Sequence, residues 1–167
     1  MKFLPFENFY IISCLKPEQV QACLQNEVEP DKRFSFSGLF SSSSDCYFTG
    51  YVINGTFEFK RIITNRNSFL PQIKGTTEAW VNGSRVHVTM KMHIGVIIFM
   101  CMWLGFALIF GIGFLIQETN KGPFKIVDIV PFGMFLFGYL LSLGGFKYES
   151  IKAKNKLVEL LNGEVAE

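Results

Sequence analysis

Basic and amide side chains flank an apolar, proline-containing segment near the middle of the chain. Residues 66–75 read RNSFLPQIKG, with Phe69, Leu70 and Pro71 in succession. Guanidinium, ammonium and amide groups can bind the phosphates of lipid headgroups, and apolar side chains can enter the neighbouring interface. The side chains that this chemistry predicts for a ligand or lipid-headgroup site are Arg61, Arg66, Asn67, Phe69, Leu70 and Lys74.

Phe69 and Leu70 have two alternative placements. As a wedge they would sit among lipid headgroups, with Arg66 beside them. As a plug they would close the bottom of a β-sheet core, because large apolar side chains are most often buried.

The other reactive side chains form no catalytic or metal-binding pattern. His87 and His93 lack a neighbouring set of ligands, and the cysteines at 14, 23, 46 and 101 include no CxxC pair. The sequence has no P-loop, GxGxxG fingerprint, HExxH motif or nucleophile elbow. We therefore expect a non-enzymatic protein with no metal and no cofactor, whose thiols are reduced.

Two apolar runs dominate the second half of the chain. Of the 167 residues, 49% are hydrophobic and 19 are Phe, and the excess falls after residue 93. Residues 94–116 contain no charge, and residues 126–146 contain only Asp128. Each run is long enough to cross about 30 Å of hydrocarbon as a helix, which predicts a transmembrane hairpin over residues 93–146.

Small residues and one acid are the notable features of this hairpin. Ala107 and Gly111, and likewise Gly138 and Ser142, are spaced four apart, which permits close helix packing within the hairpin or between subunits. Asp128 is an intramembrane charge, a type of residue that often marks ion or proton paths. Its position in the first turn of the second helix also fits a hydrated carboxylate near the membrane surface.

Basic residues flanking the runs predict the orientation. Lysines and arginines concentrate before the first run and after the second, and fewer lie in the linker between them. Because cytoplasmic flanks carry the excess of basic residues, both termini are expected in the cytoplasm. The flanking residues are Arg85, Lys91, Lys147, Lys152, Lys154 and Lys156, and those of the linker are Lys121 and Lys125.

Residues 1–92 are typical of a small α+β domain. An aromatic strand opens it, an amphipathic helix begins at Pro17, and two hairpins follow with Asn-Gly turns at residues 54–55 and 82–83. Folding about the turns sets Gly50 opposite Phe59 in the first hairpin and, in the second, Glu78 opposite His87 and Gly75 opposite Met90. The hairpins predict an antiparallel β-meander.

The last strand leads straight into the first apolar run, which fixes the direction of the meander. Both Asn-Gly turns are then expected at the end away from the membrane, and residues 62–72 near it. After the second run, residues 147–167 are typical of an amphipathic helix with Ile151, Leu157, Val158 and Leu161 on its apolar side. This tail is expected to lie on the inner leaflet or to dock onto the β domain.

The predicted organisation is therefore an α+β membrane protein. A cytoplasmic domain over residues 1–92, made of a strand, a helix and the meander, precedes the hairpin of residues 93–146. A cytoplasmic amphipathic tail over residues 147–167 follows it.

From Cys46 onward, and most specifically over residues 61–75, the chain resembles a group of small, uncharacterised bacterial two-pass membrane proteins with an RNSFLP-type segment. The resemblance implies bacterial origin and little about activity, and the membrane is expected to be the bacterial inner membrane. We expect an accessory or sensor module whose β domain binds a partner protein or small ligand, within a membrane protein complex or a homo-oligomer and without nucleic acid. The alternative is an oligomeric effector that perturbs the membrane when its β domain binds a ligand.

Overall fold

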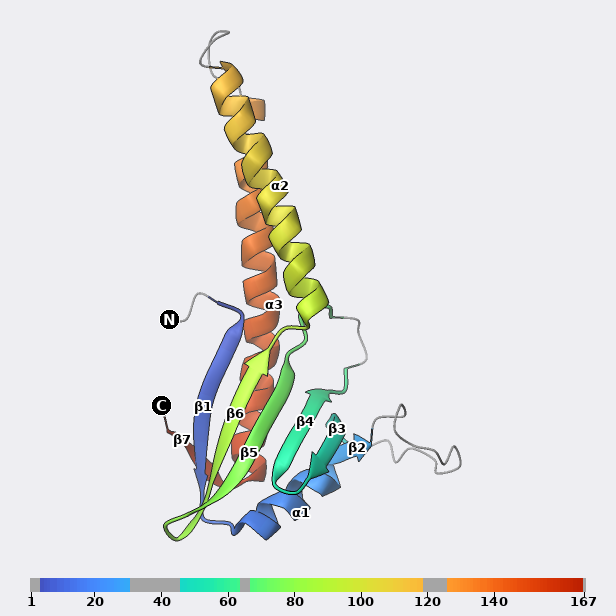
Figure 1. The fold of residues 1–167 in the computed structure, drawn as a ribbon, viewed down its shortest axis with the longest axis vertical. Helices are drawn as coiled ribbons and strands as arrows, with labels where there is room; N and C mark the ends of the chain where they lie inside the picture. Colours follow the sequence, from blue (N-terminus) through green and yellow to red (C-terminus); the bar gives the residue numbers. More distant parts are fainter. Residues whose placement is uncertain (1–3, 31–45, 64–66, 119–125, 167) are drawn as a thin grey trace, which may run out of the picture.

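A long helical hairpin projects from one end of a sheet-and-helix domain (Figure 1). The computed structural model describes residues 4–30, 46–63, 67–118 and 126–166. The strands are β1 (Phe6–Ser13), β2 (Val28–Pro30), β3 (Phe48–Ile53), β4 (Thr56–Arg61), β5 (Gln72–Trp80), β6 (Gly83–Lys91) and β7 (Gly163–Ala166). The helices are α1 (Pro17–Glu27), α2 (Ile94–Glu118), the 3-10 turn η1 (Ile126–Ile129) and α3 (Val130–Leu160).

The strands form one mixed sheet in the order β2-β3-β4-β5-β6-β1-β7. Strands β3 to β6 are the predicted antiparallel meander, and the α+β class is confirmed. The meander is only part of the sheet, because β2 pairs with β3 in parallel and β1 lies between β6 and β7. The C-terminal strand β7, which the sequence did not predict, pairs with residues 10–13 of β1.

The β3–β4 hairpin has the predicted register, including Gly50 opposite Phe59. Asn54 and Gly55 both have positive φ, at 49° and 73°, as a two-residue type I′ turn requires. In Figure 1 this turn and the β5–β6 turn both lie at the end of the sheet away from the hairpin, as expected from the direction of β6.

The β5–β6 hairpin has a different register from the predicted one. Its two-residue loop is Val81-Asn82, so Trp80 pairs with Gly83, Glu78 with Arg85, and Gly75 with Val88. Gly83 belongs to the strand because β1 passes close to it: an added Cβ would collide with the carbonyl oxygen of Ser13. The shift of two residues keeps every side chain on its predicted face but changes its partner.

Helices α1 and α3 cover one face of the sheet (Figure 1). Helix α1 contributes the fully buried Val20 and Leu24. The second half of α3 contributes Phe146, Ala153 and Leu157, and Leu161 follows directly after the helix; none of the four has exposed surface. The docking alternative for the C-terminal tail is therefore the one that the fold adopts.

Helices α2 and α3 are both long and apolar enough to cross a membrane. Helix α3 has 31 residues and is thus about 46 Å long at 1.5 Å per residue. It runs without a break past Phe146, so the predicted boundary between the hairpin and a separate amphipathic tail does not coincide with the end of a helix. One helix supplies both an apolar span and a core element of the sheet domain.

Candidate functional site

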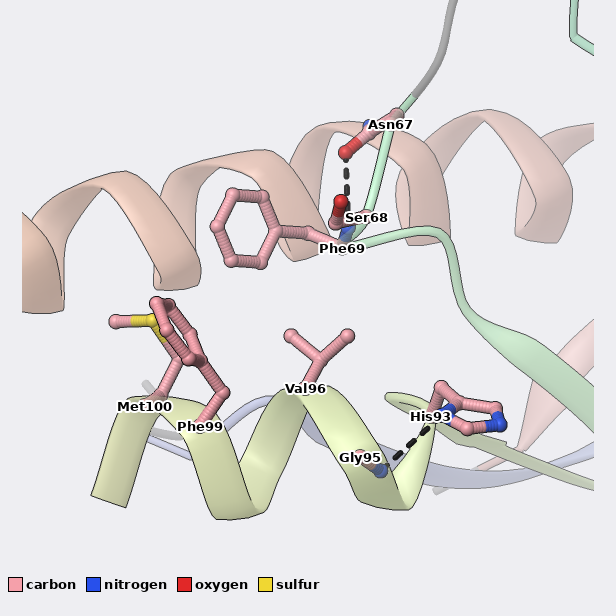
Figure 2. Close-up of a pocket in the computed structure, with 8 residues that line it drawn as sticks. All are labelled: Asn67, Ser68, Phe69, His93, Gly95, Val96, Phe99 and Met100. Carbon is pink, nitrogen blue, oxygen red and sulfur yellow. Dashed lines mark hydrogen bonds between the residues drawn. The ribbon is translucent and has the colours of Figure 1, made fainter. Parts of the chain in front are cut away.

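A pocket lies where the sheet domain meets the hairpin. It has a volume of about 500 Å³ and is bounded by the segment after β4 and by the first two turns of α2. Figure 2 shows the two walls facing one another, with the Phe69 ring extending along the pocket above the side chains of α2. The lining residues are Asn67, Ser68, Phe69, His93, Gly95, Val96, Phe99 and Met100.

The loop wall is held by its own hydrogen bonds. The Asn67 side-chain oxygen accepts from the Phe69 N–H at 3.0 Å, and the Asn67 carbonyl oxygen accepts from the Leu70 N–H at 3.3 Å. This is the local turn that an Asn side chain favours. Pro71, which follows, is fully buried.

Phe69 packs against α3. A Cβ atom at Gly145 would come within 2.9 Å of Phe69 Cδ2, so the absence of a side chain there admits the ring. Phe69 also packs against the buried core, as Val96 and Ile97 of α2 do. The ring therefore packs against the core and α3 and lines the pocket opposite α2, which agrees with the plug alternative for this residue.

His93 caps the N-terminus of α2. Its carbonyl oxygen accepts from the Val96 N–H at 2.9 Å, and its Nδ1 accepts from the Gly95 N–H at 3.1 Å. An Nδ1 that accepts a hydrogen bond leaves Nε2 as the N–H donor in the neutral ring. The helix start and the imidazole orientation are thus fixed together.

Arg61 turns into the interface between the sheet and α3. Its Nη2 lies 2.5 Å from Glu149 Oε2, and its Nη1 donates to the Tyr47 hydroxyl at 3.2 Å. Burial alone would lower the pKa of the Arg61 guanidinium, but the hydrogen bond to Tyr47 and the nearby Glu149 carboxylate outweigh burial and raise it. Arg61 is therefore a charged structural partner of α3, and it does not face outward as headgroup binding would need.

A second group of polar contacts binds α3 to β1. Lys147 Nζ lies 2.6 Å from Glu7 Oε1 of β1, and the Ser150 hydroxyl donates to the same oxygen at 3.1 Å. At the far end of the helix the Ser13 hydroxyl donates to the Leu161 carbonyl oxygen at 2.6 Å. Helix α3 is thus bonded to β4 on one side and to β1 near both ends of its docked half.

An aromatic and cationic cluster occupies the opposite face of the sheet, on which the described part of the chain places no helix (Figure 1). The Arg85 guanidinium lies 4.4 Å from the Trp80 ring centroid and 5.1 Å from that of Tyr10. Tyr10 stacks on His87 at 4.8 Å, and His87 Nε2 contacts Asn8. The register shift explains why Glu78 does not pair with His87 as predicted. Glu78 instead forms an ion pair with Arg85, whose Nη2 lies 2.9 Å from Glu78 Oε2.

The remaining predicted residues have separate locations. Lys74 is exposed on the outer face, with its Nζ 2.8 Å from Glu58, and Leu70 is partly buried beside Phe69. Of the predicted packing residues, Gly111 meets the Phe132 ring, Gly138 meets Trp103, and Ser142 donates to the Tyr139 carbonyl oxygen. Ala107 is partly exposed. Arg66 and the side chain of Asp128 lie outside the described residues.

The interpretation of the sequence missed most of the α3 residues that face the sheet; of the stripe that these residues form, it had named only Leu157 as an apolar residue of the tail. Phe146, Glu149, Ser150, Ala153 and Leu157 follow one helical stripe with a period near 3.6 residues. This stripe follows directly on the second apolar run. A helical period continuing past that run was the signal that could have predicted one long helix. The predicted tail instead counted Ile151, which is 54% exposed.

The described side chains offer hydrogen bonding and apolar contact more than reactive chemistry. No group of three or more His, Cys, Asp or Glu residues within the described ranges could hold a metal ion. Comparison with known proteins gives no relative, because no protein-family model, curated protein or solved structure matches the chain.

Proposed function

We propose that the chain is a non-enzymatic, two-pass membrane-anchored module of the accessory or sensor type, in which the hairpin fixes the sheet domain beside the bilayer. The continuity of α3 carries this proposal. A helix of about 46 Å exceeds the roughly 30 Å hydrocarbon thickness by about ten residues. Those extra residues fall within the C-terminal half of α3, which buries Phe146, Ala153 and Leu157 against the sheet.

The side chains on the hairpin support insertion in lipid. Large apolar residues are exposed along both helices, among them Phe106, Ile109 and Phe110 of α2 and Leu136 and Phe137 of α3. A continuous apolar surface of this kind is unfavourable in water and marks a membrane or protein contact.

The basic flanks support placing the sheet domain and both termini on the cytoplasmic side. Lys91 precedes α2, and Lys147, Lys152 and Lys154 follow the apolar half of α3. Together with the resemblance over residues 61–75, this favours the inner membrane of a bacterium. Tyr148, 60% exposed at this level of α3, suits the aromatic belt of a membrane interface.

The outer sheet face is the surface that we assign to a partner protein. Trp80 is 45% exposed and Val81 79% exposed, next to Arg85 and Tyr10. Trp, Tyr and Arg are the residue types that most often dominate the energy of protein interfaces. Contacts of Gly111 with Phe132 and of Gly138 with Trp103 inside the hairpin favour the accessory role over the alternative of an oligomeric effector, because these small residues already pack within one chain.

The two tryptophans provide a direct test of membrane placement. Trp80 ends β5 in the distal part of the sheet, and Trp103 lies in α2 with 41% of its surface exposed. A Trp80→Phe variant reports on Trp103 alone, and Trp103→Phe reports on Trp80 alone. In liposomes of lipids brominated on the acyl chain, we expect the Trp103 fluorescence to be quenched and that of Trp80 to be unchanged.

Non-brominated liposomes of the same headgroup composition are the control for both variants. Equal quenching of the two tryptophans would contradict the placement of the sheet domain outside the bilayer. An unquenched Trp103 would contradict the membrane anchor itself.

A further inference from the structure

We propose that the pocket between residues 67–69 and the start of α2 binds one membrane lipid through its glycerol-ester region, with an acyl chain leaving along α2. This inference rests on the proposed membrane anchor. It adds a ligand class to the pocket, which the anchor alone does not require.

The polarity of the pocket changes along its length. Figure 2 shows His93 at one end and Phe99 with Met100 at the other. Met100 lies seven positions after His93, which corresponds to a rise of about 10 Å along the helix. Because α2 enters the hydrocarbon as it leaves His93, the polar end lies at the interface and the apolar end faces the acyl-chain region.

The lining residues also restrict the chemistry of the ligand. Asn67, Ser68 and His93 provide hydrogen-bonding groups, and none of the lining residues is Lys, Arg, Asp or Glu. Such a lining suits groups that are polar but uncharged, such as ester carbonyls and glycerol hydroxyls, better than a phosphate or an ammonium group. In a bilayer the esters lie at the boundary between headgroups and hydrocarbon, which is the level of His93.

The size and rigidity of the site fit a partly enclosed lipid. A volume of about 500 Å³ lies within the range of small-molecule sites and can hold the ester region with the start of one chain. The walls are fixed before any ligand arrives, since Phe69 packs on Gly145 and His93 caps α2. A preformed site loses less conformational entropy on binding.

The test measures lipid that stays with the full-length protein. The chain is expressed in bacterial membranes, extracted in a mild detergent and passed over a size-exclusion column, and retained lipid per chain is quantified by mass spectrometry. Met100→Trp fills the apolar end of the pocket. Met102→Trp makes the same change at a residue that is 57% exposed on the same helix and outside the pocket.

The wild type and Met102→Trp are expected to retain about one lipid per chain, and Met100→Trp about tenfold less, the ratio for a steric penalty typical of an overpacked site. Ser68→Trp blocks the pocket from the other wall at an exposed position, and it should give the same loss. A melting temperature in detergent confirms that each variant is folded. If Met100→Trp is not folded, Ser68→Trp alone provides the test of pocket blocking.

Three results would overturn the lipid assignment. In the first, the blocked variants retain as much lipid as Met102→Trp. In the second, the wild type retains no lipid. In the third, the molecule that the wild type retains is a water-soluble metabolite. Acyl-chain quenching of Trp103 separates the two proposals. If Trp103 is quenched and lipid retention is unaffected by Met100→Trp and Ser68→Trp, the anchor stands and the pocket assignment fails; if Trp103 is unquenched, both fail.

Discussion

Arg61 binds an anionic group, as the sequence predicts, but that group is a carboxylate of the same chain and not a lipid phosphate. The sequence suggested lipid phosphate, and the fold supplies the Glu149 carboxylate, with 15% of the Arg61 side chain and 7% of the Glu149 side chain exposed. No local pattern links two residues this far apart in the chain. Their proximity follows from the packing of α3 on the inner face of β4.

Glu149→Gln should destabilise the protein because it leaves the Arg61 guanidinium without its counter-charge in a largely buried place. Removing one partner of a buried ion pair typically costs about 3 kcal/mol. Glu58→Gln is the matched control, since the Glu58–Lys74 pair is 33% and 58% exposed and such surface pairs contribute about 0–1 kcal/mol. Denaturant unfolding in detergent measures both, and equal losses would show that the Arg61–Glu149 pair does not hold α3 to the sheet.

The elements differ in how far their sequences determine them. The first hairpin follows from Asn54-Gly55, because both residues accept positive φ and the flanking strands alternate cleanly. In the second, Asn82-Gly83 gives the same signal, but Gly83 is required by the close approach of β1. The position of β1 beside β6 depends on pairing across some 80 residues, which no local signal encodes.

The long helices show a similar limit. Their apolar lengths can be read directly from composition, and so can the small residues between them. The end of α3 cannot be read from composition in this way, because Gly144, Gly145 and the lysines that follow are also typical of a helix leaving the membrane. The pocket was predictable only on its Asn67 and Phe69 wall, since its α2 wall depends on how the hairpin meets the sheet.

Gly83→Ala tests the role of the β1–β6 contact. The added methyl would overlap the Ser13 carbonyl, so the strands must separate, at a cost of about 1–3 kcal/mol. Gly105→Ala is the control in α2, where nothing lies within 4 Å of an added Cβ and alanine improves helix propensity by about 1 kcal/mol. Melting temperatures in detergent should fall for Gly83→Ala and not for Gly105→Ala; the opposite order would refute the assigned register.

At the scale of the whole molecule, α3 makes the hairpin and the sheet one mechanical unit. Its first half pairs with α2, and its second half is bonded to β1 and β4 and buried under the sheet. A tilt or rotation of the hairpin would therefore move the outer face of the sheet, where Trp80 and Arg85 lie. Such a coupling would allow the proposed accessory or sensor module to relate the state of the membrane to a partner bound at that face.

The most direct test measures whether α3 is one rigid helix in a bilayer. Spin labels are attached after Leu136→Cys and Ile151→Cys, at sites that are 56% and 54% exposed, in a background whose four native cysteines are replaced. Double electron–electron resonance in nanodiscs should give a single narrow distribution near 22 Å, the rise over fifteen helical residues. Gly144→Pro in the same labelled chain should broaden it, which establishes sensitivity to a break. A broad or two-peaked distribution without that proline would contradict the continuous link between membrane hairpin and sheet domain.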